Sequence, residues 1–277
     1  MGLRIQTNIA AMSAQRALGK TSIEQGKSYQ RLSSGFRITS AGDDAAGLSI
    51  SENLRAQIRS MGQAERNTND GISLVQVAEG GLNEIANILI RQRELSIQAA
   101  SDTVGDRERG FINQEIQSSK AEIDRIASVT TFNGTPLLNG EASKGELEFQ
   151  VGIRNDNADR ILCNVADNDV KTSTLGVEGV STETIDDARA ALDALDEGLG
   201  RVNETRARLG AMQNKLHSTV NNLQIARENL SQAKSRIADT DLAEETSKLV
   251  RENILQSAGV AVLSQANSAP LQALKLL

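Results

Sequence analysis

A seven-residue repeat of apolar side chains runs through the last third of the chain and constrains its fold more than any other feature. From Ile185 to Ile237 the repeat advances by alternating steps of three and four residues, and most of its positions hold Leu, Val, Ile or Ala. This spacing places an apolar stripe along one face of a helix, where a partner helix can cover it. A repeat of this length is typical of a coiled coil, so we expect one long helix over the whole segment.

A second long helix is predicted in the first half of the chain, because the same repeat runs from Leu54 to Leu89. Asp43 or Asp44 can cap its start, and the pattern extends to about Ala100. Such a helix would be roughly 85 Å long, at ~1.5 Å per residue. Each glycine inside it weakens the helix by roughly 1 kcal/mol relative to Ala, so these positions indicate a close neighbour or a bend. They are Gly62, Gly71, Gly80 and Gly81.

The middle of the chain combines a third helix with turns and strands. After a break near residues 101–105, where Asp102 or Asp106 can cap the next helix, the repeat resumes and ends near Val129. Asn-Gly turn signals follow, and residues 146–153 then alternate between apolar and polar side chains. We therefore expect a β-hairpin near 146–166, and because an isolated hairpin is marginally stable, it should lie against the helices.

Both ends of the chain carry apolar side chains in a scattered pattern. The last segment, residues 242–277, is too apolar to remain in water and too short and interrupted to span a membrane. Burial against other copies of the chain resolves this conflict, so we expect the two ends to pair and to form an interface between subunits. The predicted interface residues are Ile5, Ile9, Leu32, Phe36, Leu249, Ile254, Leu255, Val260, Leu263, Leu271 and Leu274.

The composition favours thin helical packing over a thick core. Aromatic residues make up 2% of the chain, and its apolar residues are mainly Leu, Ile, Val and Ala, whereas stacked sheets would draw on more rings. Pro136 and Pro270 are its only prolines, so long helices are permitted. The predicted fold class is mainly α: a long-helix coiled-coil rod with paired N- and C-terminal helices and a small β-hairpin region.

The chain offers few groups for catalysis or metal binding. His217 is its only histidine and falls within a predicted helix, and Cys163 is its only cysteine, which we expect to pack as a small apolar side chain. Asp43 and Asp44 are adjacent and would not face each other on a helix, so capping is their favoured role. The sequence therefore predicts no enzyme, no metal and no cofactor.

The charge pattern and the start of the chain limit the expected partners. The net charge is −6 with both signs interspersed, so no basic surface for nucleic acid is predicted. No apolar run reaches the ~20 residues of a membrane span, and the start MGLRIQTNIAAMSAQ does not look like a cleavable signal. We expect no membrane insertion, and either a cytoplasmic location or export by a signal-independent route.

Several motifs strongly resemble those of bacterial flagellins. The block RLSSGFRITSAGDDAAGLSI at 31–50 resembles the amino-terminal signature of that family, and RQREL at 91–95 matches it further along. LSQAN at 263–267 resembles the carboxy-terminal signature. The resemblance spans about residues 1–140 and 185–277 in the order typical of the family.

The resemblance implies a subunit of the flagellar filament without a bulky outer domain. Residues 1–42 and 235–277 would be the N- and C-terminal helices of an inner-tube domain, and residues 43–180 and 181–234 the helical shell around it. The implied partners are other copies of the chain or related flagellins, flagellar cap and hook-associated proteins, an export chaperone and the flagellar type III export apparatus. The implied location is extracellular, in the filament, after export without a cleaved signal peptide.

The same resemblance points to a surface on the helical shell. Flagellins that a host Toll-like receptor senses use an Arg, a Leu and a Glu, which correspond to Arg91, Leu95 and Glu115. An alternative to receptor binding is lateral packing between subunits, and we expect this packing to be the primary role of these residues.

Two other classes stand as alternatives. A hook-filament junction protein shares the terminal helices, and its copy number per flagellum would separate it from a filament subunit. A signalling coiled coil would need a membrane segment or a sensor module, and neither is visible in the sequence.

Overall fold

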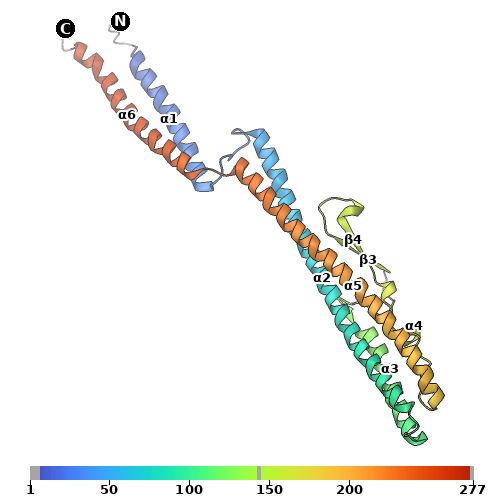
Figure 1. The fold of residues 1–277 in the computed structure, drawn as a ribbon. Helices are drawn as coiled ribbons and strands as arrows, with labels where there is room; N and C mark the ends of the chain where they lie inside the picture. Colours follow the sequence, from blue (N-terminus) through green and yellow to red (C-terminus); the bar gives the residue numbers. More distant parts are fainter. Residues whose placement is uncertain (1–6, 142–144, 275–277) are drawn as a thin grey trace. The chain divides into compact units, whose positions relative to one another are not determined.

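The computed structural model describes residues 7–141 and 145–274, with side chains described as far as 268. Long helices dominate these residues, and the strands form two small antiparallel pairs, which confirms the predicted mainly α class (Figure 1). Contacts divide the chain into a central unit, residues 59–227, and a terminal unit, residues 1–58 with 228–277. The main elements are α1 (Ile9–Ser34), α2 (Ala45–Ala99), α3 (Asp106–Val129), β1 (Thr131–Phe132), β2 (Thr135–Pro136), β3 (Glu146–Gln150), β4 (Arg160–Asn164), α4 (Thr172–Leu175), α5 (Ile185–Ala238) and α6 (Leu242–Leu274).

The central unit is built on α2 and α5, which bury the predicted repeats. Every position of the repeat in α5 is buried or half-buried, as the coiled-coil pattern predicts. The helices run antiparallel, because Arg93 Nε lies 2.6 Å from Asp196 Oδ1 while Arg227 Nη1 lies 2.6 Å from Glu65 Oε2. The fully buried positions shared between them include Val75, Leu82, Leu89, Leu195, Val202 and Leu216.

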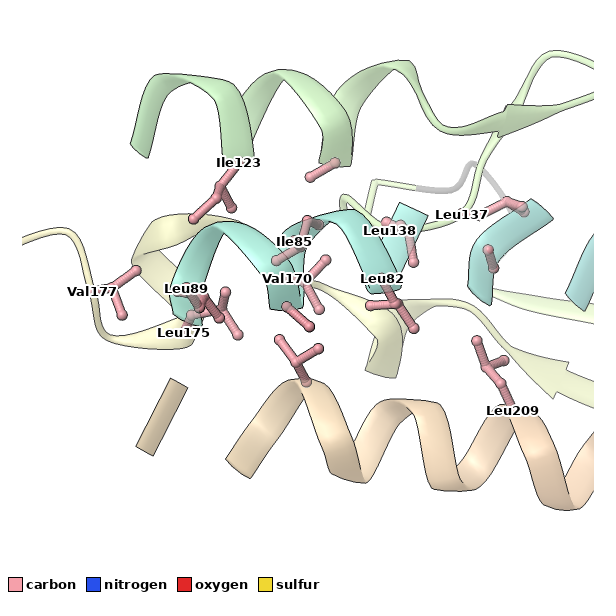
Figure 2. Close-up of a cluster of buried hydrophobic side chains, with 14 of the residues drawn as sticks. Leu82, Ile85, Leu89, Ile123, Leu137, Leu138, Val170, Leu175, Val177 and Leu209 are labelled. Carbon is pink, nitrogen blue, oxygen red and sulfur yellow. The ribbon is translucent and has the colours of Figure 1, made fainter. Parts of the chain in front are cut away.

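A second face of α2, which the sequence did not reveal, is buried as well. Figure 2 shows α2 between α3 and α5, with Ile123 reaching from α3 and Leu209 from α5. The buried residues of this second face also recur every seven positions, and they are Ala78, Ile85, Gln92 and Ala99. Two covered faces explain why a helix of this length is stable despite its glycines.

The starts of the helices confirm one predicted cap and correct another. Asp44 Oδ1 accepts a hydrogen bond from Gly47 N at 2.8 Å, so Asp44 caps α2 as predicted. At α3 neither Asp102 nor Asp106 is the cap: Gly105 occupies that position, without a side-chain hydrogen bond. Asp106 is instead the first helical residue, and its Oδ1 accepts from Arg109 Nη1 at 2.7 Å.

The buried Arg109 side chain explains this arrangement. Its Nε donates to Ala99 O at 2.9 Å and its Nη2 to Ser101 O at 3.2 Å, so it bonds carbonyls at the end of α2 and just after it. Because one guanidinium bonds both the end of α2 and Asp106, it fixes the turn between α2 and α3.

The predicted β-hairpin is present and lies on the helices. In its β3–β4 ladder Leu147 pairs with Cys163 and Phe149 with Ile161. The strand stops at Gln150 rather than at residue 153, because the amides of the next two residues both donate to Asp159 O and regular pairing ends.

Two of the glycines in α2 mark close approaches, as expected. A Cβ at Gly71 would lie 3.3 Å from Phe149 Cδ1, and one at Gly81 would lie 2.8 Å from Leu138 Cδ1. Gly80, in contrast, would meet no atom within 4 Å. The first two glycines therefore let the hairpin and the segment after β2 pack directly on the helix.

Candidate assembly surfaces

The terminal unit pairs the two ends of the chain, as predicted, with α1 beside α6 (Figure 1). The Asn8 side chain caps α1 by accepting from Ala11 N at 3.0 Å, and its amide donates to Ala266 O at 2.8 Å. At the other end of the pair, Arg31 Nη1 lies 3.7 Å from Glu245 Oε1. Residues early in α1 thus meet residues late in α6, so the pair is antiparallel.

The seam between α1 and α6 is lined mainly by small and polar side chains. The more buried residues of each helix recur every three or four positions, so each helix turns one face to the other. Gly259 permits a close approach, because a Cβ there would lie 2.7 Å from Leu18 Cδ2. The seam includes Ala11, Ala14, Leu18, Thr21, Gln25, Ser28 and Leu32 of α1, and Glu245, Leu249, Glu252, Gln256, Gly259, Leu263 and Ala266 of α6.

Many large apolar side chains of the terminal helices are exposed, although four leucines lie in the seam. In a soluble pair of amphipathic helices such residues fill the seam, and polar residues face the solvent. Here the seam holds mainly small and polar residues beside its leucines, and further large apolar side chains face outward. We call these exposed residues the outer apolar set; they are Ile9, Met12, Ile23 and Tyr29 of α1, and Leu242, Val250, Ile254, Leu255, Val260 and Val262 of α6.

The residues predicted for the terminal interface divide between these two surfaces. Leu32, Leu249 and Leu263 face the α1–α6 seam. Ile5 lies outside the described residues, as do the side chains of Leu271 and Leu274. The others are exposed, and they are Ile9, Phe36, Ile254, Leu255 and Val260.

The connections α1–α2 and α5–α6 are joined to each other. Arg37 N donates to Ala238 O at 2.7 Å, and Thr240 N donates to Gly35 O at 2.9 Å. Gly35 has a φ of +73°, a left-handed conformation that glycine adopts without strain as it ends α1. These backbone hydrogen bonds fix where α1 ends relative to where α6 begins.

On the central unit, the structure brings together Arg91 and Glu115 but not Leu95. Arg91 Nη2 lies 3.2 Å from Glu115 Oε1, and its Nη1 lies 3.2 Å from Glu94 Oε2. The hydrogen bonds that Arg91 donates to the Glu94 and Glu115 carboxylates raise its pKa above the ordinary value. Leu95 is only 3% exposed and packs in the core, which corrects the expectation that its side chain is part of the accessible surface.

An exposed aromatic ring lies on α3, close in sequence to Glu115, and sequence reasoning missed it. Phe111 is one of the exposed large apolar residues, and the Arg107 guanidinium carbon lies 5.9 Å from the centre of its ring. At that distance a cation–π attraction contributes about 0.5–1 kcal/mol at an exposed site. Its neighbours in the apolar repeat of α3 are buried, so only its place outside that repeat could have indicated exposure.

Within the described part of the chain, neither its only histidine nor its only cysteine belongs to a cluster of potential metal ligands. His217 is exposed on α5. Cys163 is buried on β4 opposite Leu147, and burial raises the pKa of its thiol, so it packs as the small apolar side chain that was predicted. No helix within residues 7–141 or 145–274 combines the length and the apolar character that a membrane span requires.

Comparison with known proteins identifies the family. The family model for the bacterial flagellin N-terminal helical region matches residues 5–143, and the model for the C-terminal helical region matches residues 192–277. The chain is also 44% identical over 273 residues to a flagellin of Halalkalibacterium halodurans, a match that covers 99% of each chain. The chain belongs to the bacterial flagellins. The resemblance seen in the sequence is thereby confirmed at both ends.

Further relatives of this flagellin are filament proteins of similar length. It is 42% identical over 287 residues to the flagellar filament 33 kDa core protein of Treponema phagedenis, with 99% of each chain covered. It is 40% identical over 303 residues to the flagellin of Bacillus subtilis, covering 99% of this chain and 100% of the other.

Solved structures agree with the fold of this flagellin. The crystal structure of Bacillus cereus flagellin matches with a TM-score of 0.50 at 29% identity, covering 57% of this chain and 88% of that one. A structure described as a flagellar hook-associated protein from Vibrio parahaemolyticus matches with a TM-score of 0.59 over 71% of this chain and 100% of that one. At 15% identity the second likeness concerns the fold alone, so it does not favour the junction-protein alternative.

This flagellin is therefore a structural subunit of the bacterial flagellar filament, the polymer that serves swimming motility, and it assembles with other copies of itself.

Proposed function

We propose that this flagellin polymerises through the outer apolar set of α1 and α6. The exposure of these ten large apolar side chains in the terminal pair carries the proposal. Pairing α1 with α6 covers a seam of mainly small and polar residues and leaves the outer apolar set in water, where another chain can cover it. Full burial of one large aliphatic side chain contributes about 1.5–3 kcal/mol, so the set as a whole supplies the driving force.

The domain arrangement follows from the difference in burial between the central unit and the terminal pair. The central unit has its own buried core and folds without a neighbour, whereas the terminal pair needs one. Residues 1–42 and 235–277 accordingly form the inner tube of the filament, and residues 43–180 and 181–234 form the helical shell. The two separate family matches, at 5–143 and 192–277, support a division into an N-terminal and a C-terminal half.

The experiment compares two Ile→Ser variants of matched exposure. Ile254 in α6 is 63% exposed and Ile225 in α5 of the central unit is 59% exposed. Ile254→Ser should raise the critical concentration for polymerisation by about tenfold, measured by sedimentation and electron microscopy, because about 1.4 kcal/mol of burial corresponds to that factor. Ile225→Ser should change it much less, and circular dichroism of both monomers should match the parent. Equal effects of the two variants would remove the terminal pair from its proposed role.

The exposed Arg91–Glu115 pair belongs to a lateral contact between subunits in the shell. Its exposure and the nearby exposed ring of Phe111 support this role. In the free subunit the same surface is open to a host Toll-like receptor. Arg91→Ala should weaken both filament stability to heat and receptor signalling by the monomer; unchanged values for both would exclude the surface from both roles.

The subunit acts outside the cell and has no catalytic role. It leaves through the flagellar type III export apparatus with an export chaperone, and in the flagellum it meets cap and hook-associated proteins. Family membership supports this route. Loss of an export-apparatus component in the native host should leave the chain inside the cell, and continued appearance in the medium would refute the route.

A further inference from the structure

Two Asn-Gly pairs lie between α3 and β3, and the structure gives them opposite surroundings. Asn133 and Gly134 form the exposed tip of the β1–β2 hairpin, with φ values of +49° and +77°. Both positive values are those of a type I′ turn, for which Asn-Gly is the preferred sequence. A Cβ at Gly134 would meet no atom within 4 Å, so solvent reaches the turn freely.

The second pair, Asn139-Gly140, is enclosed. Asn139 is 9% exposed, and its Oδ1 accepts a hydrogen bond from Glu141 N at 3.0 Å. A Cβ at Gly140 would lie 3.0 Å from Asp169 Cβ. The Asn139 side chain is therefore held in place and shielded from water, although its sequence neighbour is the same.

We propose that Asn133 is a site of spontaneous deamidation and that the fold protects Asn139 from the same reaction. The Gly134 amide nitrogen, after losing its proton to a solvent base, attacks Asn133 Cγ and forms a new C–N bond. The Cγ–Nδ2 bond breaks, and the nitrogen leaves as ammonia after taking up one proton from water. Water then opens the cyclic imide at either of its carbonyls. The products are Asp and isoaspartate at this position, and the net reaction consumes water and releases ammonia without a redox step.

The local structure permits this ring closure. Gly134 has no side chain to shield its nitrogen. The turn must leave its left-handed conformation for the nitrogen to reach Cγ, but β1 and β2 contain only two residues each. Such a short ladder opens at a small free-energy cost, whereas freeing Asn139 requires opening of a buried segment.

Modification would act locally on the hairpin. Isoaspartate inserts an additional carbon into the main chain, so a two-residue turn cannot keep its register. Either product adds a carboxylate to the cleft that Asn133 shares with Glu146 and Glu148, where like charges repel. Leu137 and Leu138 are fully buried immediately afterwards and hold the rest of the fold in place.

The experiment follows both sites in one purified full-length chain. The protein is incubated for weeks at mildly alkaline pH, digested and mapped by mass spectrometry, and isoaspartate is labelled with an isoaspartyl methyltransferase. In the folded chain, conversion at Asn133 should be at least about tenfold faster than at Asn139, because opening precedes reaction at the buried site. In concentrated urea the two sites should react at similar rates, since each is followed by glycine.

Two variants complete the test. Asn133→Gln should remove almost all labelling of the folded chain, because glutamine must close a larger ring and does so slowly. Asn139→Gln should leave the labelling unchanged. Equal conversion of both sites in the folded chain, or no conversion at Asn133 while the unfolded chain reacts, would overturn the proposal.

Discussion

Replacing Gln92 with methionine should stabilise the central unit, because the polar side chain of Gln92 is buried inside it. Gln92 has zero exposure, and within the described residues neither its Oε1 nor its Nε2 has a hydrogen-bond partner. Leu89 and Ser96, one turn away on either side, are also fully buried. The amide has therefore lost its hydration without gaining a replacement, which is unfavourable for folding.

The expected gain follows from the cost of such a group. A buried polar group without a partner costs about 1–3 kcal/mol. Methionine is unbranched, similar in length and a good helix former, so it can fill the same space among apolar neighbours. Because repacking recovers only part of the cost, we expect the free energy of unfolding to rise by about 1–2 kcal/mol. For a domain of this size that corresponds to a rise in Tm of roughly 2–8 °C.

The assay is urea denaturation followed by circular dichroism, with Gln98→Met as the matched control. Gln98 is exposed on the same helix, so its replacement removes no buried amide and should leave the midpoint nearly unchanged. The slope of the unfolding transition should be equal in all three proteins, because the surface exposed on unfolding is the same. If Gln92→Met lowers the midpoint while the control does not, the amide is satisfied in the folded chain, and the reasoning is refuted.

Two further perturbations test the packing of the central unit. Gly81→Ala should lower the free energy of unfolding by about 1–3 kcal/mol because its methyl group would lie 2.8 Å from Leu138 Cδ1. Gly80→Ala, with no atom within 4 Å, should raise it by about 1 kcal/mol, and effects of the same sign in urea denaturation would contradict this packing. Lys120→Met should cost about 1–3 kcal/mol, because Lys120 Nζ donates to two carbonyls before α5, Glu178 O at 2.7 Å and the buried Val180 O at 2.5 Å. Burial lowers the pKa of Lys120 below its ordinary value of 10.5, so between the two values the unfolded chain binds more protons and stability rises with pH. The stability gap between the parent and this variant should therefore widen as the pH approaches 10.5, and a gap that narrows would refute the sign.

Local patterns in the sequence were sufficient to predict the long helices, the hairpin and the cap of α2. A seven-residue repeat requires only that one helix face be covered, so the course of α5 could be read without knowing its partner. The cap of α2 could be narrowed to Asp43 or Asp44 because a cap acts on amides within its own first turn, and the structure selected Asp44. The Arg91 and Glu115 pair was found only through the resemblance to flagellins, since no spacing rule connects residues on different helices.

Tertiary structure decided which further faces are buried. The repeat in α2 gave one covered face, and the second became visible only when α3 was packed against Ala78, Ile85 and Ala99. Arg109 and Lys120 would be assigned to the surface from their charge, but backbone carbonyls from other segments satisfy them in the interior. Burial depends on neighbours that are distant in sequence, and side-chain type alone does not specify them.

The terminal helices show most clearly what the sequence determines and what the tertiary structure decides. The sequence determined that the two ends are too apolar to remain uncovered, because this depends on composition. Only the structure decided which side chains face inward: the contact of Leu18 with the space left by Gly259 aligns small and polar residues in the seam. Ile254 and its apolar neighbours are then left outside, because a helix that turns one face to its partner must expose the other.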